Sequence, residues 1–344
     1  MYRGVPTVGS MHMKKVRDSN KIWILLIEGV EQGVFLAQSQ LKSILAHSRM
    51  FAHSQMAWLM CLGMMLAGDA LGQGSRGGAE QPALAAADFS TLEADETVGL
   101  FLLVGQSNMK GRGQIDLEPV VDPRVKFFHL GERKWFVARE PLHALGTPGN
   151  LVRNDNSGTG PGTSFGHSVI GKSGDALIGL IPAAEGGVPI RRYAPGERFY
   201  VRSLEMVAQA KESAPPKSEL RAILWLQGES DAQNAEQVAA YEAQLLDLID
   251  RYRRDFGDPE LPFIVCTIGS FIADGARAQR FPFSESINEI LLALPEKREH
   301  TACIDARDIK GHVGDALHYN AEAQLEIGRR FASAYLELID SRQK

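Results

Sequence analysis

The chain has 344 residues, of which 44% are hydrophobic and 23% are charged, a composition typical of a globular protein with enough length for one large domain or two small ones. Its formal net charge of -5 shows no basic excess, so we predict no nucleic-acid partner. The three cysteines are widely spaced, which excludes a disulfide scaffold and a four-cysteine zinc site.

A candidate signal peptide lies at about residues 50–72. Arg49 and His53 precede an apolar run over residues 56–67, and small residues follow it. This is the order of a secretory signal peptide, and the run is shorter than the roughly 20 residues that span a bilayer. We therefore predict export to the periplasm or the cell exterior, without stable membrane insertion after processing. Because signal peptides begin at the start of a chain, we predict either a translation start at Met50 or Met56 or an unusually long n-region. The alternative is a buried or amphipathic helix in a cytoplasmic protein.

The chain divides into three predicted regions. Residues 1–72 form an N-terminal extension that includes the candidate signal peptide. Residues 73–94 are rich in Gly, Ala, Ser and Gln, which predicts a flexible linker. The regular pattern of residues 95–344 predicts one folded domain.

Apolar runs and helical patterns alternate along this domain. Short runs without strict alternation, typical of strands buried on both faces, occur at residues 99–104, 125–130, 176–182, 221–226, 262–268 and 301–305. Apolar residues at steps of three and four predict helices at residues 198–214, 234–256, 284–294 and 320–339. This order predicts an α/β domain with a mostly parallel sheet.

Polar residues at the ends of these strands are the strongest site candidates, because open parallel sheets bind ligands beyond the carboxyl ends of their strands. Ser107 lies just past the first strand, and Gly105 allows a backbone turn before it. A serine in this place can be a nucleophile, with its own N–H facing a developing negative charge. The alternative is an ordinary junction between a strand and a loop.

A nucleophilic serine needs a base and a group that orients the base. His318 is the candidate base, and Asp315, three residues earlier, can hold its other ring nitrogen. The helix that follows is predicted to start near Asn320, which is a good N-cap. The alternative is an exposed turn with a capping aspartate, and His312 is a rival base.

Oxyanion donors are expected from three places, beginning with Ser107 itself. The glycine-rich segment 158–166 lets backbone N–H groups approach a ligand, and Gly162 is our candidate there. Gln227, at the end of a strand, offers a side-chain N–H. The glycine-rich segment lacks the Lys-Ser/Thr end of a phosphate-binding loop.

Five further polar residues are predicted to support the site or contact substrate: Gln106, Asn108, Arg112, Glu229 and Asp231. We expect the two acids to pair with Arg112, and the alternative for them is a solvated loop. Lys110 and Arg112 either bind substrate or anchor their loop.

Five segments together resemble the SGNH-hydrolase superfamily, in the branch of carbohydrate esterase family 6 and sialate O-acetylesterase-like domains. They are "GQSNMKGRG", "GTGPGTSFG", "EGGVPIRRYAPG", "LWLQGESDA" and "DALHYN", and the resemblance covers about residues 97–340. A match of all five in order is far more specific than any one of them.

The resemblance implies a flavodoxin-like three-layer α/β/α fold and a serine esterase that removes O-acetyl groups from poly- or oligosaccharides. Ser107 would be the nucleophile, Asp315 and His318 its partners, and Gly162 and Gln227 the oxyanion donors beside Ser107. No metal or organic cofactor is expected. The alternatives are an SGNH lipase or thioesterase acting on another acyl ester, and a non-catalytic carbohydrate-binding domain.

One segment departs from the family pattern. Val188 and Tyr193 occupy places where the family often carries Thr or Ser and then Trp. We expect this loop to face the substrate, so that its changes alter sugar specificity.

Overall fold

The computed structural model describes residues 83–90, 92–116, 120–143 and 156–342. The predicted signal peptide and the first part of the predicted linker lie outside these residues. None of the helices in the described ranges combines the length and apolarity needed to cross a membrane.

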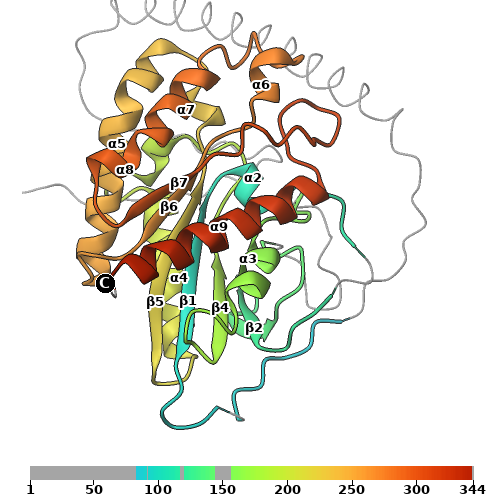
Figure 1. Ribbon diagram of the computed structural model, residues 1–344, viewed down its shortest axis with the longest axis vertical. Coiled ribbons are helices and arrows are strands. Elements are labelled where there is room, and N and C mark those ends of the chain that lie inside the picture. The colour runs from blue at the N-terminus through green and yellow to red at the C-terminus, as the bar shows by residue number, and fades with distance from the viewer. Residues whose placement is uncertain (1–82, 91, 117–119, 144–155, 343–344) are drawn as a thin grey trace, which may run out of the picture. The chain divides into compact units, whose positions relative to one another are not determined.

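The described chain folds around one seven-stranded sheet with the order β3-β2-β4-β1-β5-β6-β7 (Figure 1). All neighbouring strands are parallel except β2 and β3, which pair antiparallel at one edge. The strands are β1 (Val98–Gly105), β2 (Val125–His129), β3 (Lys134–Val137), β4 (Leu177–Pro182), β5 (Ser218–Leu226), β6 (Phe263–Cys266) and β7 (Thr301–Ile304).

Helices cover both faces of the sheet, which makes the fold the predicted three-layer α/β/α type. On one face, α3 (Gly162–Val169) and α9 (Ala321–Arg342) pack beside each other, and in Figure 1 they lie in front of the strands. Phe101 of β1 contacts ring atoms from both of these helices. On the other face, α4 (Arg198–Glu212) and α5 (Ala235–Phe256) meet through Tyr200 and Tyr252. Burial of β1 on both sides explains its continuous run of apolar residues.

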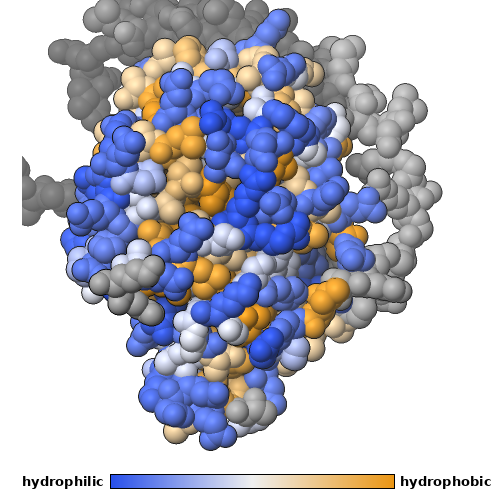
Figure 2. All heavy atoms as spheres, in the orientation of Figure 1, coloured by the Kyte–Doolittle hydropathy of each residue, from blue (hydrophilic) through white to orange (hydrophobic). Residues whose placement is uncertain are grey.

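Shorter elements complete the domain. They are the helices α2 (Ser107–Lys110), α6 (Phe271–Asp274), α7 (Ser284–Leu292) and α8 (Leu294–Lys297), and the 3-10 turns η1 (Ile190–Tyr193) and η2 (Glu229–Asp231). In the same orientation, hydrophilic side chains alternate with smaller hydrophobic areas on the visible surface (Figure 2).

Local capping signals account for the ends of the two long helices. Asn234 accepts a hydrogen bond from the Gln237 N–H at the start of α5, and Gly257 ends this helix in a left-handed conformation. Asn320 accepts from the Ala323 N–H at 3.0 Å, which confirms the predicted cap of α9.

The structure adds elements that the sequence pattern did not predict. β3 is only four residues long, and α3 begins inside the glycine-rich segment that we expected to be a loop. Part of the predicted linker also packs on the sheet. Ala87 donates a backbone hydrogen bond to Trp135, and the Phe89 ring contacts the same residue, so residues 84–89 do not behave as a flexible linker.

Gly105, at the end of β1, is predicted to be intolerant of any side chain. Its φ of +135° is an angle that glycine adopts readily and other residues rarely adopt. A Cβ atom there would lie 2.2 Å from the Leu226 carbonyl oxygen. We expect Gly105→Ala to lower the free energy of unfolding by about 3 kcal/mol, measured by urea denaturation. Gly257→Ala is the matched control, since Gly257 also has a positive φ but has open space around it. An equal loss in both variants would contradict the steric argument.

Candidate active site

The candidate site lies at the carboxyl edge of the sheet. Ser107 begins α2 directly beyond β1, and Glu229 follows β5, the neighbouring parallel strand. The loop that carries His318 connects β7 to α9 and reaches the same edge. Parallel strands therefore bring together residues that are far apart in the sequence.

Ser107, His318 and Asp315 form a row of hydrogen bonds. His318 Nε2 lies 2.9 Å from Ser107 Oγ, and His318 Nδ1 lies 2.6 Å from Asp315 Oδ2. The other carboxylate oxygen of Asp315 accepts the backbone N–H groups of Leu317 and His318. A carboxylate at Nδ1 holds the hydrogen on that nitrogen, so Nε2 is left to accept the serine proton.

The loop around this row is shaped by His312. Its Nδ1 accepts hydrogen bonds from the N–H groups of Gly314 and Ala316, and its backbone pairs with Tyr319. The ring nitrogen that would make His312 a base is thus used to hold the turn. The rival base considered from the sequence is therefore a structural residue of the loop.

The electrostatic setting keeps His318 neutral. Burial lowers the pKa of His318 below its ordinary 6.5, the neighbouring Asp315 raises it, and the positive charges of Arg112 and Arg277 lower it further. Burial raises the pKa of Asp315, but hydrogen bonds from His318 outweigh burial and the net shift is downward. A neutral imidazole beside an ionised carboxylate is ready to accept a proton.

This setting predicts an acid limb in the pH–rate profile. Because a base must be unprotonated, activity should be lost as the pH falls through the lowered pKa of His318, with a midpoint below 6.5. Arg277→Gln removes a nearby positive charge and should move the midpoint to higher pH. The measurement is kcat/KM for p-nitrophenyl acetate from pH 4 to 9, and an unmoved midpoint would contradict the role of this charge.

Gln227 differs from its predicted role as an oxyanion donor. It is fully buried, and its Nε2 donates to Gln106 Oε1, the Val188 carbonyl and Asp231 Oδ2. An amide has two N–H hydrogens, so these three acceptors leave none for an oxyanion. The structure corrects the sequence prediction here, because Gln227 holds Gln106 in place.

Gly162 begins α3 and is packed against the core. A Cβ atom there would lie 2.4 Å from Leu142 Cδ1 and 2.8 Å from Leu103 Cδ2, so packing alone requires a glycine. Its role in an oxyanion hole stays a prediction. Glu140 lies in no motif and was not predicted as part of the site. It is a buried carboxylate that accepts from the Thr163 N–H and from the Leu142 N–H and so holds this glycine-rich segment.

Glu229 and Asp231 do not pair with Arg112 as we expected. Glu229 accepts from the Asn108 side chain, and Asp231 accepts from Gln227 and the Ile190 N–H. Burial raises the pKa of Glu229 to about 7 and that of Asp231 to about 6. Arg112 donates instead to backbone carbonyls on its own and a neighbouring loop. The two acids are thus buried parts of the site rather than residues of a solvated loop.

The structure decides the open alternative for Lys110 and changes the prediction for Tyr193. Lys110 is buried and pairs with Glu185 at 3.0 Å, so it anchors its loop to the segment after β4. Tyr193, expected to face the substrate, is fully buried, and its hydroxyl bonds the N–H and carbonyl of Gly105 at 3.3 and 2.7 Å. Tyr193 therefore braces the turn before Ser107, a role that spacing could not reveal.

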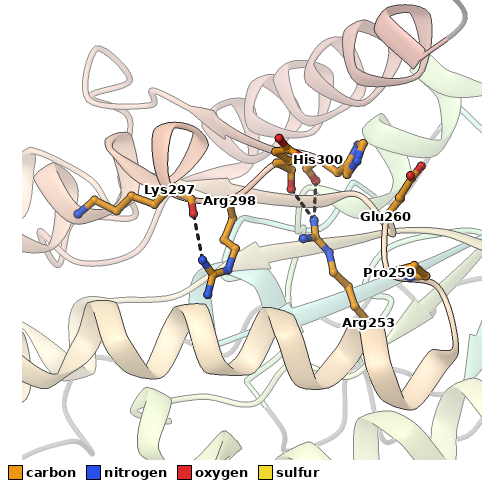
Figure 3. A pocket seen from close by; sticks show the side chains of 7 residues that line it. Arg253, Pro259, Glu260, Lys297, Arg298 and His300 are labelled. Atoms are coloured by element: carbon orange, nitrogen blue, oxygen red, sulfur yellow. Dashed lines mark hydrogen bonds between the residues drawn. The ribbon is translucent and has the colours of Figure 1, made fainter.

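A polar pocket of about 380 Å³ lies away from this site (Figure 3). It lies at the amino ends of β6 and β7, whereas Ser107 lies at the carboxyl edge of the sheet. Arg253 in this pocket donates to the carbonyls of Leu261, Glu299 and His300. Its polar groups tie neighbouring loops together, and it is not the candidate active site.

Comparison with solved structures shows that the fold is a known one. The X-ray structure of an Arabidopsis thaliana protein aligns with a TM-score of 0.57 and 28% identity, over 70% of this chain and 98% of that one. The crystal structure of NanS aligns with a TM-score of 0.55 and 14% identity, over 72% and 98% of the two chains, which shows the shared fold. The chain therefore shares its three-layer fold with these two proteins.

Sequence comparison identifies the family. Residues 97–337 match the family described as carbohydrate esterase, sialic acid-specific acetylesterase. A probable carbohydrate esterase of Arabidopsis thaliana is 32% identical over 253 residues, which cover 69% of this chain and 90% of the relative. The chain belongs to this carbohydrate acetylesterase family and is a carboxylic ester hydrolase.

Proposed function

We propose that this protein is a serine esterase that removes O-acetyl groups from carbohydrate through an acetyl-serine intermediate. The observation that carries the proposal is the hydrogen-bonded row of Ser107, His318 and Asp315. The match to a carbohydrate acetylesterase family supports the acetylated sugar as substrate.

Each residue of the row has a defined step. Ser107 Oγ attacks the acetyl carbonyl carbon while its proton moves to His318 Nε2. The imidazolium then gives this proton to the departing sugar oxygen, which leaves an acetyl group on Ser107. Water enters, His318 takes one of its protons, and the resulting hydroxide displaces Ser107, which regains its proton as acetate is released. Asp315 stabilises the imidazolium at both stages.

The oxyanion requires N–H donors, and two groups are available beside the nucleophile. The Ser107 N–H makes no hydrogen bond to another residue in the described part of the chain. Gln106 Oε1 accepts from Gln227 Nε2 and the Ser230 N–H, and these bonds fix the orientation of the amide. Gln106 Nε2 has no acceptor among the described residues. We assign these two N–H groups to the oxyanion or to a nearby substrate oxygen.

The sugar class is tested with a panel of acetylated compounds. We expect acetate release from acetylated xylo-oligosaccharides or from O-acetyl sialic acid, and little hydrolysis of acyl-CoA. Faster hydrolysis of acyl-CoA or of long-chain esters would overturn the carbohydrate assignment in favour of a thioesterase or lipase.

The serine mechanism is tested separately with a fluorophosphonate probe. Wild-type protein should incorporate one probe molecule, and peptide mass spectrometry should place it on Ser107. A folded protein that is not labelled and releases no acetate from any compound in the panel would overturn the serine esterase assignment and favour the non-catalytic alternative.

A further inference from the structure

Asn108 connects the nucleophile to the loop that carries His318. This asparagine follows Ser107 directly and is fully buried. Its Nδ2 donates to the Leu317 carbonyl, and its Oδ1 accepts from the Tyr319 N–H, both at 3.1 Å. One side chain thereby holds the residues on both sides of His318.

The orientation of the Asn108 amide is determined by its partners. Its second Nδ2 hydrogen goes to Glu229 Oε1, so both donors and the acceptor are used. Turning the amide over would place oxygen against the Leu317 carbonyl and the Glu229 carboxylate, and nitrogen against the Tyr319 N–H. All three contacts would then be repulsive, so only one orientation is stable.

The bonds between His318 and Asp315 hold the imidazole within its own loop, because Asp315 lies in the same loop. They do not hold the loop relative to Ser107. The Asn108 side chain does, and Gln324 at the start of α9 adds a bond to the Asn108 carbonyl at 2.9 Å.

We propose that Asn108 is a positioning residue, which sets the Ser107 Oγ to His318 Nε2 distance by clamping residues 317 and 319, and that Glu229 holds the clamp in its working orientation. The inference rests on the proposed serine esterase function. Glu229 forms no ion pair with a cation of the described chain, and burying a carboxylate without one costs free energy. Acids buried at such a cost are typical of functional sites. The raised pKa of Glu229 is consistent with this burial.

The first test removes the Asn108 side chain, which forms the clamp. Asn108→Ala should lower kcat for p-nitrophenyl acetate by about 100-fold, because a displacement of about 1 Å between reacting groups costs that much. KM should change by less than about threefold, since Asn108 is fully buried and its side-chain donors and acceptor are used within the protein. The rate of fluorophosphonate labelling at Ser107 should fall with kcat.

Asn288→Ala is the matched control. Asn288 is equally buried, and its amide bonds the N–H and carbonyl of Ile268 at 2.8 and 3.2 Å rather than any group of the His318 loop. The Asn288→Ala variant should lose thermal stability as Asn108→Ala does, but its kcat should stay within about twofold of wild type. Equal kcat losses in the two folded variants would overturn the proposal, because the effect would then be one of general stability.

A second pair of variants, both at Glu229, keeps the proposal testable if Asn108→Ala does not fold. Glu229→Ala removes the acceptor that orients Asn108 and should lower kcat by about tenfold or more. Glu229→Gln still offers an oxygen to Asn108 and should recover most of this loss. Absence of recovery would overturn the role of Glu229. Failure of the esterase function would look different, because wild type itself would then neither hydrolyse acetyl esters nor react with the probe.

Discussion

Ser107→Ala should lower kcat for acetyl ester hydrolysis by about 10⁴-fold or more while the protein stays folded. The Ser107 hydroxyl is the group in the row that can form the acetyl intermediate, and it is the row's donor to His318 Nε2. Removing it deletes one partly exposed hydrogen bond, so the melting temperature should change by only a few degrees. The measurements are acetate release from an acetylated oligosaccharide, and thermal unfolding.

The control for this prediction is another serine hydroxyl. Ser168 on α3 donates its hydroxyl to the Ser164 carbonyl and lies outside the row. Ser168→Ala should keep kcat within about twofold, since it loses only a local helix contact. If Ser107→Ala retained more than a tenth of wild-type kcat, the acetyl-serine mechanism would be wrong.

Asp315→Asn should lower kcat by about 10⁴-fold with little effect on the fold. The asparagine Oδ1 can still accept the N–H groups of Leu317 and His318, so the loop keeps its shape. Its NH₂ group would face His318 Nδ1, which must then accept a hydrogen bond. The ring hydrogen moves to Nε2, and this nitrogen can no longer take the Ser107 proton.

The readouts for Asp315→Asn separate chemistry from folding. Steady-state kinetics should show the loss in kcat with KM changed by less than about threefold, and probe labelling of Ser107 should slow in parallel. Asp308→Asn is the control, because Asp308 is an exposed acid that pairs with Arg330 outside the site. Retention of a tenth of the wild-type kcat in Asp315→Asn would show that the carboxylate does not set the histidine tautomer.

Local patterns were enough to predict the fold class. The alternation of apolar runs and helical periods indicated the parallel sheet, because strands buried on both faces read as continuous apolar runs. The four-residue β3 has too few residues to show a period. Helix α3 was missed because three glycines lie in the segment around its start, and its stability comes from packing against α9.

In the candidate site, too, the residues that could be predicted are those whose place depends on a single element. Asp315 and His318 are three residues apart, so their contact is set by one turn and could be predicted from the sequence. Ser107 could be predicted because it follows an apolar strand, at the end where parallel sheets bind their ligands.

The signal peptide at about residues 50–72 lies outside the described residues and stays a prediction.

The sequence by itself determined the α/β architecture and the residue types of the row, since both follow from periodicity and spacing within single elements. Tertiary structure alone decided how the polar groups around the row are used. Gln227 has no N–H to spare, Tyr193 supports Gly105 from 88 residues away, and Asn108 reaches Tyr319 across 211 residues. These roles depend on which acceptor each buried donor meets, and that is settled only when the strands, helices and loops pack together.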